Sequence, residues 1–249
     1  MGAEDDDGGG AGERAAVPAG TAQRLLQRLL QRKRERERAA AAAEGGGGAA
    51  GAGDPSLYGS QGYWEARYRA ADLRAAAAKE EWYVGYARLG ALFRRHLDRS
   101  DRVLLLGCGM STLTEDMAND GYADVVGVDY SHECIGRMRE EFPESRVEYR
   151  VMDVLDLQYA DGECGALVDK GTLDTLCQNE DGAGARMLRE ACRVLRDGGV
   201  FLSVSYGDKE DRLPLLLDGS LAWTLRDSCV LRKGRLEYFV YVMERDVRR

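Results

Sequence analysis

Seven short apolar runs, most of them separated by amphipathic stretches, constrain the fold of this chain more than any other feature. The runs have the length and composition expected of strands, and they fall at 102–106, 124–128, 147–152, 165–169, 199–205, 221–231 and 236–244. Helical patterns lie at about 64–97, 111–120, 132–141, 173–178 and 183–196. Strands that alternate with helices form crossover units, which predicts an α/β fold with a mostly parallel sheet.

The C-terminal end departs from this alternation. Its last two runs are joined by a short segment around Lys233-Gly234, which is a turn signal, with no helical pattern between them. Such a pair is typical of a β-hairpin, whose two strands run antiparallel. We therefore expect at least one antiparallel strand at the end of the sheet.

The first 55 residues differ in composition from the rest of the chain. They consist mostly of glycine, alanine and charged residues, as in "DDDGGGAG" and "AAAAAEGGGGAAGAG". Such a segment cannot bury enough apolar surface to offset the entropy lost on ordering. We expect a disordered tail over 1–55 and one domain over 56–249. Within the tail, 21–43 is typical either of a targeting or partner-binding helix or of a solvated, partly helical segment, and the preceding acidic residues favour the second.

The net charge argues against nucleic acid as a partner. The whole chain carries −8, and because residues 1–55 hold 8 basic and 9 acidic residues, about −7 of it falls on the predicted domain. Nucleic-acid-binding domains usually present a basic surface, whereas an acidic domain attracts a basic partner.

Cysteine spacing and hydropathy predict neither a metal centre nor a membrane span. The 6 cysteines form no C-x-x-C pair and the chain has only 2 histidines, so a zinc site is not expected. Free thiols are typical of a reducing compartment, which predicts a cytoplasmic protein. No apolar run approaches the ~18–20 residues that a transmembrane helix needs.

The first strand-like run ends in a glycine elbow, "VLLLGCGMST" at 103–112. A Gly-x-Gly turn after a buried strand lets the backbone approach a ligand at the switch point of a parallel sheet. Asp129 ends the second run, twenty residues after Gly109, where a carboxylate reaches the two hydroxyls of a ribose. A dinucleotide site would place a third glycine where Thr112 stands, so the elbow favours a nucleoside without a diphosphate.

A second carboxylate follows the third run. Asp153, in "VMDVLDL", falls in the next loop at the same edge, where its carboxylate or the neighbouring backbone can bind an adenine edge. Either aspartate alone is equally typical of a loop turn or a helix cap. Two of them, in order after two strands of the expected spacing, predict a site for the nucleoside of S-adenosylmethionine (SAM).

The chain resembles the class I, seven-strand SAM-dependent methyltransferases. The matching stretches are "GYWEARY" (62–68), "LLLGCGMSTL" (104–113), "VVGVDYS" (125–131), "VMDVLDL" (151–157), "DKGTLDTL" (169–176) and "VLRDGGVFLSVS" (194–205). The "DKGTLD" and "YWEARY" stretches narrow the resemblance to the methyltransferase-like group that includes lysine methyltransferases of translation elongation factor 1-alpha. It implies a Rossmann-like sheet, SAM as cofactor and methyl transfer as the activity.

The resemblance also implies which residues hold SAM. The methionine part is expected to lie against Gly107 and beside Lys170. The nucleoside is expected to contact two pairs that follow the second and third strands: Asp129 with Tyr130 at the ribose and the adenine face, and Asp153 with Val154 at the adenine edge.

An aromatic arm completes the expected cofactor site. Trp64 and Tyr68 are four residues apart, hence on one helical face. In the family this arm folds over the cofactor together with the aromatic residue that Trp82 matches. Plain core packing is the alternative for these three side chains.

No catalytic base is assigned from the sequence. A lysine acceptor must lose its proton before it attacks, and because its reference pKa is ~10.4, a narrow apolar channel would help by desolvating the charged form. Asp169 and Asp174 flank the expected transfer position, either to orient the amine or as a strand-end turn and a helix-start residue.

Three functions remain open at this point. The acidic domain and the "DKGTLD" resemblance favour a methyltransferase acting on a lysine of a basic protein, with elongation factor 1-alpha as first candidate. The alternatives are a methyltransferase of small molecules and a non-enzymatic SAM-binding interaction module. The Gly107, Asp129 and Asp153 set argues against the last.

Overall fold

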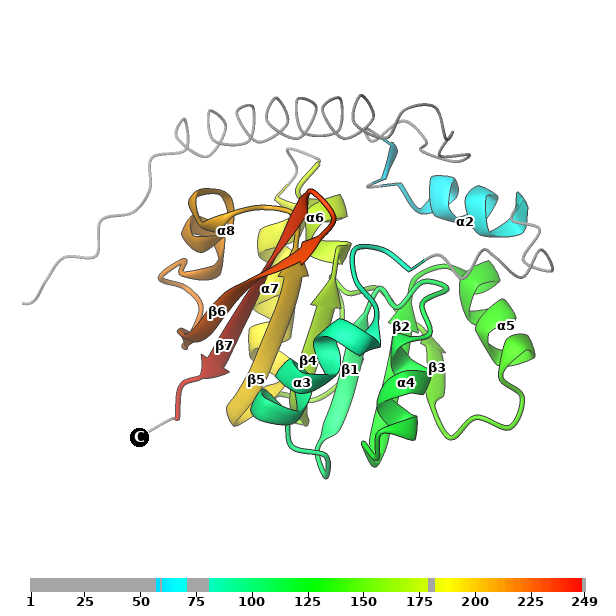
Figure 1. Cartoon of the computed structure of the whole chain (residues 1–249), viewed down its shortest axis with the longest axis horizontal. Coiled ribbons are helices and arrows are strands. Elements are labelled where there is room, and N and C mark those ends of the chain that lie inside the picture. The colour runs from blue at the N-terminus through cyan, green and yellow to red at the C-terminus, as the bar shows by residue number, and fades with distance from the viewer. Residues whose placement is uncertain (1–56, 59, 71–80, 179–181, 248–249) are drawn as a thin grey trace, which may run out of the picture.

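The computed structural model describes residues 57–58, 60–70, 81–178 and 182–247. The tail predicted over 1–55 lies outside the described residues. Seven strands form one sheet in the order β3-β2-β1-β4-β5-β7-β6 (Figure 1). Their bounds are β1 (Arg102–Leu106), β2 (Asp124–Asp129), β3 (Glu148–Val151), β4 (Cys164–Lys170), β5 (Leu195–Ser205), β6 (Trp223–Lys233) and β7 (Leu236–Arg245).

The strand directions confirm the predicted mixed sheet. Strands β1 to β5 pair in parallel, whereas β7 runs antiparallel to β5 and forms an antiparallel hairpin with β6. The hairpin turns at Gly234, whose φ of 61° is a left-handed conformation that glycine adopts without steric cost. Between Leu225 and Asp227 the pairing of β6 with β7 shifts register, as at a β-bulge.

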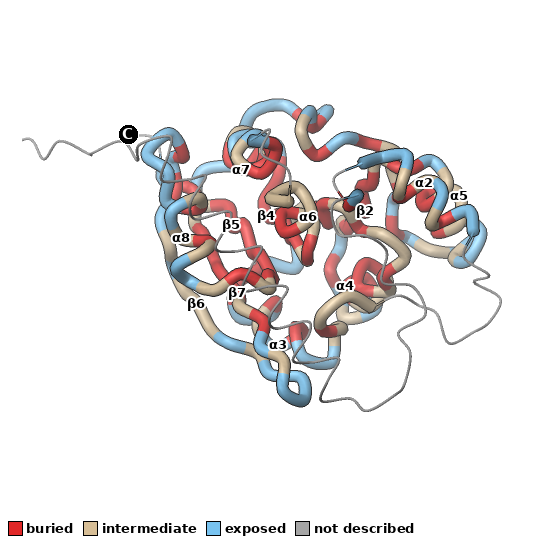
Figure 2. Tube along the Cα trace, turned by 90° about the horizontal axis from the view of Figure 1, so that it is seen from above, coloured by how far each residue is buried: buried red, intermediate tan, exposed pale blue. Residues whose placement is uncertain are grey.

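Helices cover both faces of the sheet, and alternate strand residues decide which side chains meet them. Val103 and Leu105 pack towards α3 (Tyr86–His96), α4 (Leu113–Asn119) and α5 (His132–Glu141). Leu104 and Leu106 pack towards α6 (Thr172–Leu176), α7 (Ala183–Val194) and α8 (Lys209–Leu216). The central strands β1, β2 and β4 are thus buried on both sides, as their continuous apolar runs predict (Figure 2).

The helix α2 (Gln61–Ala70) lies apart from these two layers. It crosses the C-terminal edge of the parallel strands beside α5 (Figure 1). Among the described helices, none combines the length and the apolarity that crossing a membrane requires.

The helical pattern predicted over 64–97 is wrong as one helix. It is divided between α2 and α3, and residues 81–85 between them are not helical. Tyr83 there has a φ of 66°, and its hydroxyl donates a hydrogen bond of 2.6 Å to the buried Asp174. A contact 91 positions away thus fixes the backbone against its local helical preference.

The helix α8 has no counterpart in the sequence prediction. It contains Pro214, which lacks the N–H that a helix interior needs, and its apolar residues show no clear helical period. Asp208 caps its first turn by accepting bonds from the amides of Glu210 and Asp211. That aspartate is the one local signal by which the helix could have been found.

Candidate cofactor-binding site

One cavity of about 300 Å³ opens at the C-terminal edge of the sheet, among the loops that follow β1, β2, β3 and β4. Every residue that the sequence assigned to the cofactor lines it: Trp64, Tyr68, Trp82, Gly107, Asp129, Tyr130, Asp153, Val154 and Lys170. The fold thus brings these nine residues around a single space. That they bind a cofactor stays a prediction.

The glycine elbow lets the loops after β1 and β4 meet closely. Gly107 has a φ of 63°, and a Cβ atom there would lie 2.2 Å from the Oγ1 of Thr172. The Thr172 hydroxyl donates to the Leu106 carbonyl at 2.8 Å. Gly109, with a φ of 54°, would bring a Cβ within 3.1 Å of the Tyr68 hydroxyl. A side chain at either position would therefore displace a wall of the cavity.

Asp129 is fixed between the elbow and the start of α5. One carboxylate oxygen accepts a hydrogen bond from the Gly109 amide at 3.1 Å, and the other accepts one from the Ser131 amide at 3.0 Å. Burial raises the pKa of Asp129 to about 6, against the lowering effect of these two bonds. A carboxylate has about four acceptor positions, so two remain for the hydroxyls of a ribose.

The loop after β3 forms the adenine side of the predicted site. The Asp153 carboxylate accepts a bond of 2.9 Å from the Leu155 amide, which is the turn role that the sequence left open. Its side chain is exposed, whereas Val154 is buried beside it. A turn that exposes backbone next to an apolar side chain suits the edge and face of a purine, so the residues present fit the nucleoside of SAM.

The aromatic arm both packs together and lines the cavity. The Trp64 and Tyr68 rings stack with centroids 5.7 Å apart, and Trp82 lies 5.6 Å from Trp64. The Trp64 indole donates a 2.7 Å hydrogen bond to the carbonyl of Tyr58. Core packing and a place at the cofactor cavity were alternatives in the sequence, and the geometry here satisfies both.

Two polar residues of α2 that the sequence analysis missed hold the arm in place. Gln61 donates to the carbonyl of Tyr130 at 2.8 Å. Glu65 accepts from the amides of His132 and Glu133, the first two residues of α5, at 2.8 and 3.3 Å. Burial raises the pKa of Glu65, but these backbone bonds outweigh it and hold that pKa below its usual value. The four-residue spacing of Gln61 and Glu65, beside that of the aromatic pair, was the available signal.

A charged contact lies where Lys170 borders the cavity. The Lys170 ammonium lies 2.6 Å from a carboxylate oxygen of Glu81 and donates to the Trp82 carbonyl at 2.9 Å. The Ser111 hydroxyl also donates to Glu81, at 2.9 Å to the nearer oxygen. Glu81 was not predicted, since nothing local in the sequence marks its distant partners.

Asp169 and Asp174 are structural residues that do not line the cavity. Asp169 accepts bonds from the Leu173 amide at 3.0 Å and the Ser203 hydroxyl at 2.6 Å, and burial raises its pKa to about 7. Asp174 forms a buried ion pair with Arg212. Burial raises the pKa of Asp174, but the guanidinium and several hydrogen bonds outweigh it and lower that pKa. Of the described lining residues, only Asp129 and Asp153 carry a carboxyl group.

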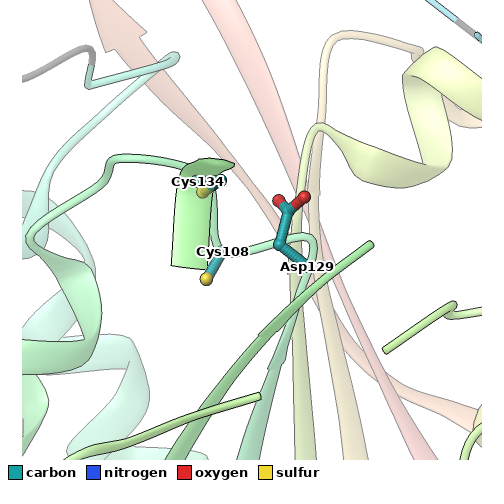
Figure 3. Close-up of side chains that lie close together, drawn as sticks. All are labelled: Cys108, Asp129 and Cys134. Atoms are coloured by element: carbon teal, nitrogen blue, oxygen red, sulfur yellow. The ribbon is translucent and has the colours of Figure 1, made fainter. Parts of the chain in front are cut away.

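Cys108, Asp129 and Cys134 lie close together beneath the elbow (Figure 3). Their ligand atoms fall within 4.8 Å of one another. A hydrogen bond with Cys108 together with burial raises the pKa of Cys134. This disfavours the thiolate that a metal requires. The group therefore packs the elbow against α5.

Comparison with known proteins agrees with this geometry. The profile of a family described as "Methyltransferase domain" matches residues 104–203. The chain is 30% identical over 177 residues to the eEF1A lysine and N-terminal methyltransferase of Danio rerio, covering 70% of this chain and 25% of that protein. It is 28% identical over 194 residues to EEF1A lysine methyltransferase 4 of Mus musculus, covering 74% of each. The chain thus spans about a quarter of the first relative.

Solved structures share the fold at low identity. A Burkholderia thailandensis 1,6-didemethyltoxoflavin-N1-methyltransferase with bound S-adenosylhomocysteine superimposes with a TM-score of 0.57 at 20% identity, covering 80% of this chain and 93% of that one. A Methanosarcina mazei SAM-dependent methyltransferase gives 0.55 at 19% identity, covering 63% and 98%. From the strand order, the cavity and these matches together, the chain has the fold of the class I SAM-dependent methyltransferases, and its cofactor is SAM.

Proposed function

We propose that this protein transfers the methyl group of SAM to a lysine side chain of a protein, with elongation factor 1-alpha as first candidate. The observation that carries the proposal is the match to EEF1A lysine methyltransferase 4 of Mus musculus, which extends over 74% of both chains. The acidic character of the chain, with a net charge of −8, supports a basic partner.

Methyl transfer requires of the protein mainly that it positions the acceptor and excludes water. Bound SAM supplies a methyl group already activated on a sulfonium. The chain's own task is to hold the acceptor in line and to favour its neutral form. Trp64 and Trp82 at the cavity are suited to exclude water there, because desolvation lowers the pKa of an amine. The absence of a spare carboxyl among the described lining residues supports deprotonation without a dedicated base.

We place this reaction in the cytoplasm. All 6 cysteines of the chain are free thiols, and most of them are buried. A reducing compartment is the ordinary setting for such a protein.

The deciding experiment offers the full chain both kinds of acceptor at once. The protein is incubated with methyl-labelled SAM and a cell extract, and separately with purified elongation factor 1-alpha. An Asp129→Ala variant, impaired in the cofactor site, is the matched control. We expect label in protein, on a lysine identified by mass spectrometry, and none with the variant. Label only on small metabolites, or on arginine or carboxylate side chains, would refute the lysine proposal and leave SAM as the cofactor.

A further inference from the structure

Lys170 lines one end of the cavity, and Glu81, which does not line it, forms an ion pair with this lysine. The two groups lie 2.6 Å apart, and the Lys170 side chain is only 7% exposed while that of Glu81 is 25% exposed. Ser111 donates to both oxygens of the Glu81 carboxylate, at 2.9 and 3.1 Å. The carboxylate is thus shared between the elbow loop and the end of β4.

The expected ligand carries the same two charges at its corresponding end. The methionine part of SAM is a zwitterion with an α-ammonium and an α-carboxylate group, and Lys170 borders the end of the cavity where that part is expected. We propose that Glu81 and Lys170 exchange partners when SAM binds, so that Glu81 receives the α-ammonium and Lys170 the α-carboxylate. Glu81 is then a cofactor-binding residue and a specificity determinant for the amino-acid end.

Electrostatics explain why Glu81 and Lys170 form an ion pair. Burying a charge carries a large desolvation cost, and the attraction of an opposite charge at contact distance offsets part of that cost. In the structure the two side chains compensate each other. With the zwitterion bound, one ion pair is replaced by two, so no buried charge is left without a partner, and each new contact is a charge-assisted hydrogen bond.

The position of Glu81 in the chain couples this exchange to the aromatic arm. Glu81 directly precedes Trp82, and Lys170 also donates to the carbonyl of Trp82 at 2.9 Å. An alternative role is therefore that the ion pair only fastens the arm. The two roles predict different ligand affinities. An ion pair that only holds the arm in place strengthens the binding of every ligand that contains the adenosine part. A site for the zwitterion strengthens only the binding of ligands that contain the amino-acid part.

Calorimetric titration of the full chain with two ligands separates these roles. S-adenosylhomocysteine contains the amino-acid part, and 5′-methylthioadenosine lacks it. For Glu81→Gln we expect the affinity for S-adenosylhomocysteine to fall roughly tenfold or more, as for loss of a hydrogen bond between charged groups. We expect the affinity for 5′-methylthioadenosine to change less than about twofold. Glu144→Gln, which removes an exposed carboxylate outside the cavity lining, is the matched control.

An equal loss of affinity for both ligands would overturn the proposal and show that the ion pair only holds the arm in place. Unchanged affinity for both ligands would also overturn it. If Glu81→Gln lacks a cooperative melting transition, Glu81→Asp takes its place. That variant keeps the charge and shortens its reach, and the same ligand selectivity is expected of it.

A third ligand tests whether Lys170 binds the α-carboxylate. Decarboxylated SAM keeps an ammonium and lacks the α-carboxylate. Lys170→Gln is expected to weaken the binding of S-adenosylhomocysteine and to leave that of decarboxylated SAM nearly unchanged. Glu81→Gln should weaken the binding of both ligands. If Lys170→Gln weakens the binding of both ligands equally, Lys170 does not bind the α-carboxylate. All of these measurements concern the cofactor alone, so their failure leaves the lysine-acceptor proposal untouched.

Discussion

Three buried aspartates near the C-terminal edge of the sheet are stabilised in different ways. Asp174 is paired with Arg212, so its pKa is lowered despite burial. Asp129 and Asp169 accept hydrogen bonds but form no ion pair with any described residue, and burial raises their pKa to about 6 and about 7. A carboxyl whose pKa is raised on folding stabilises the folded state below its unfolded pKa, and this contribution is lost as the pH rises through the folded value.

We predict that Asp169→Asn stabilises the protein at pH 8. The asparagine oxygen still accepts from the Leu173 amide, and its NH₂ group can donate to the Ser203 hydroxyl. The pKa of Asp169 is raised from 3.8 to about 7, and each pKa unit corresponds to about 1.4 kcal/mol, so a gain of up to about 4 kcal/mol is expected. Thermal melting as a function of pH should show the gain shrinking through pH 7 and gone near pH 4. A variant equal to the wild type at pH 8 would contradict this.

The same substitution at Asp174 is expected to have the opposite effect. Asp174→Asn would leave the Arg212 guanidinium, which is 4% exposed, without its counter-ion. Losing one partner of a buried pair costs about 3–5 kcal/mol. Melting at pH 7 should therefore show a large loss of stability. A change of a few tenths of a kcal/mol would show that the ion pair carries little energy.

Asp129→Ala is expected to weaken SAM binding roughly tenfold to a hundredfold, which corresponds to ~1.5–3 kcal/mol for a hydrogen bond to a charged group. Because the pKa of Asp129 is raised to about 6, wild-type affinity should also fall as the pH drops below that value. Calorimetry between pH 5 and 8 measures both effects. Unchanged affinity in a folded variant would sink the ribose role of this residue.

At the scale of elements, α2 is held over the cavity by polar contacts on one face. Gln61, Glu65 and Arg69 are four apart, and each bonds to the β2–α5 region, Arg69 through its carbonyl to the Arg137 side chain at 3.0 Å. The aromatic pair Trp64 and Tyr68 lies on the neighbouring face. One face therefore binds the helix to α5 while the next lines the cavity.

We predict that Glu65→Ala weakens cofactor binding although Glu65 does not line the cavity. Loss of a cap at the start of α5 costs about 0.5–2 kcal/mol, part of which should appear as a faster dissociation of S-adenosylhomocysteine. Stopped-flow displacement measures that rate. Glu140→Ala, an exposed carboxylate in the last turn of α5, is the control. Equal rates in the two variants would show that α2 is held without Glu65.

The sequence predicted those elements whose signals are local. All seven strands were predicted because each lies in a strand-like segment that the sequence shows locally, and the Lys233-Gly234 turn indicated the antiparallel pair. Residues 81–85 were taken as helix because their conformation depends on Asp174, far along the chain. Glu65 and Glu81 were missed for the same reason, since each acquires its partners only when the arm is folded over the sheet.

At the scale of the whole molecule, the net negative charge bears on the choice of acceptor. A basic protein is attracted to an acidic surface over a Debye length of ~8 Å at physiological salt. We predict that methylation of a basic protein slows as sodium chloride is raised, through a lower kcat/KM. A small neutral acceptor should show little such dependence, and a rate independent of salt would contradict an electrostatically steered protein substrate.

Truncation tests the predicted domain boundary. The described core begins with Tyr58, and α2 contributes Trp64 and Tyr68 to it. Removing residues 1–55 should therefore leave SAM binding and Tm nearly unchanged, whereas removing residues 1–70 should abolish SAM binding. Calorimetry and thermal melting of the two proteins decide this. If both behave alike, the boundary is wrongly placed.

The two edge strands of the sheet affect how readily copies of the protein pair with one another. At one edge of the sheet β3 is only 4 residues long, and at the other β6 is bulged at Leu225/Asp227 and exposes Arg226, Arg232 and Lys233. Short strands, bulges and outward cations all hinder the addition of a foreign strand. Neither border of the sheet is therefore a template for backbone pairing, and crowded molecules lack the flat apolar edge from which sheet-to-sheet aggregation starts.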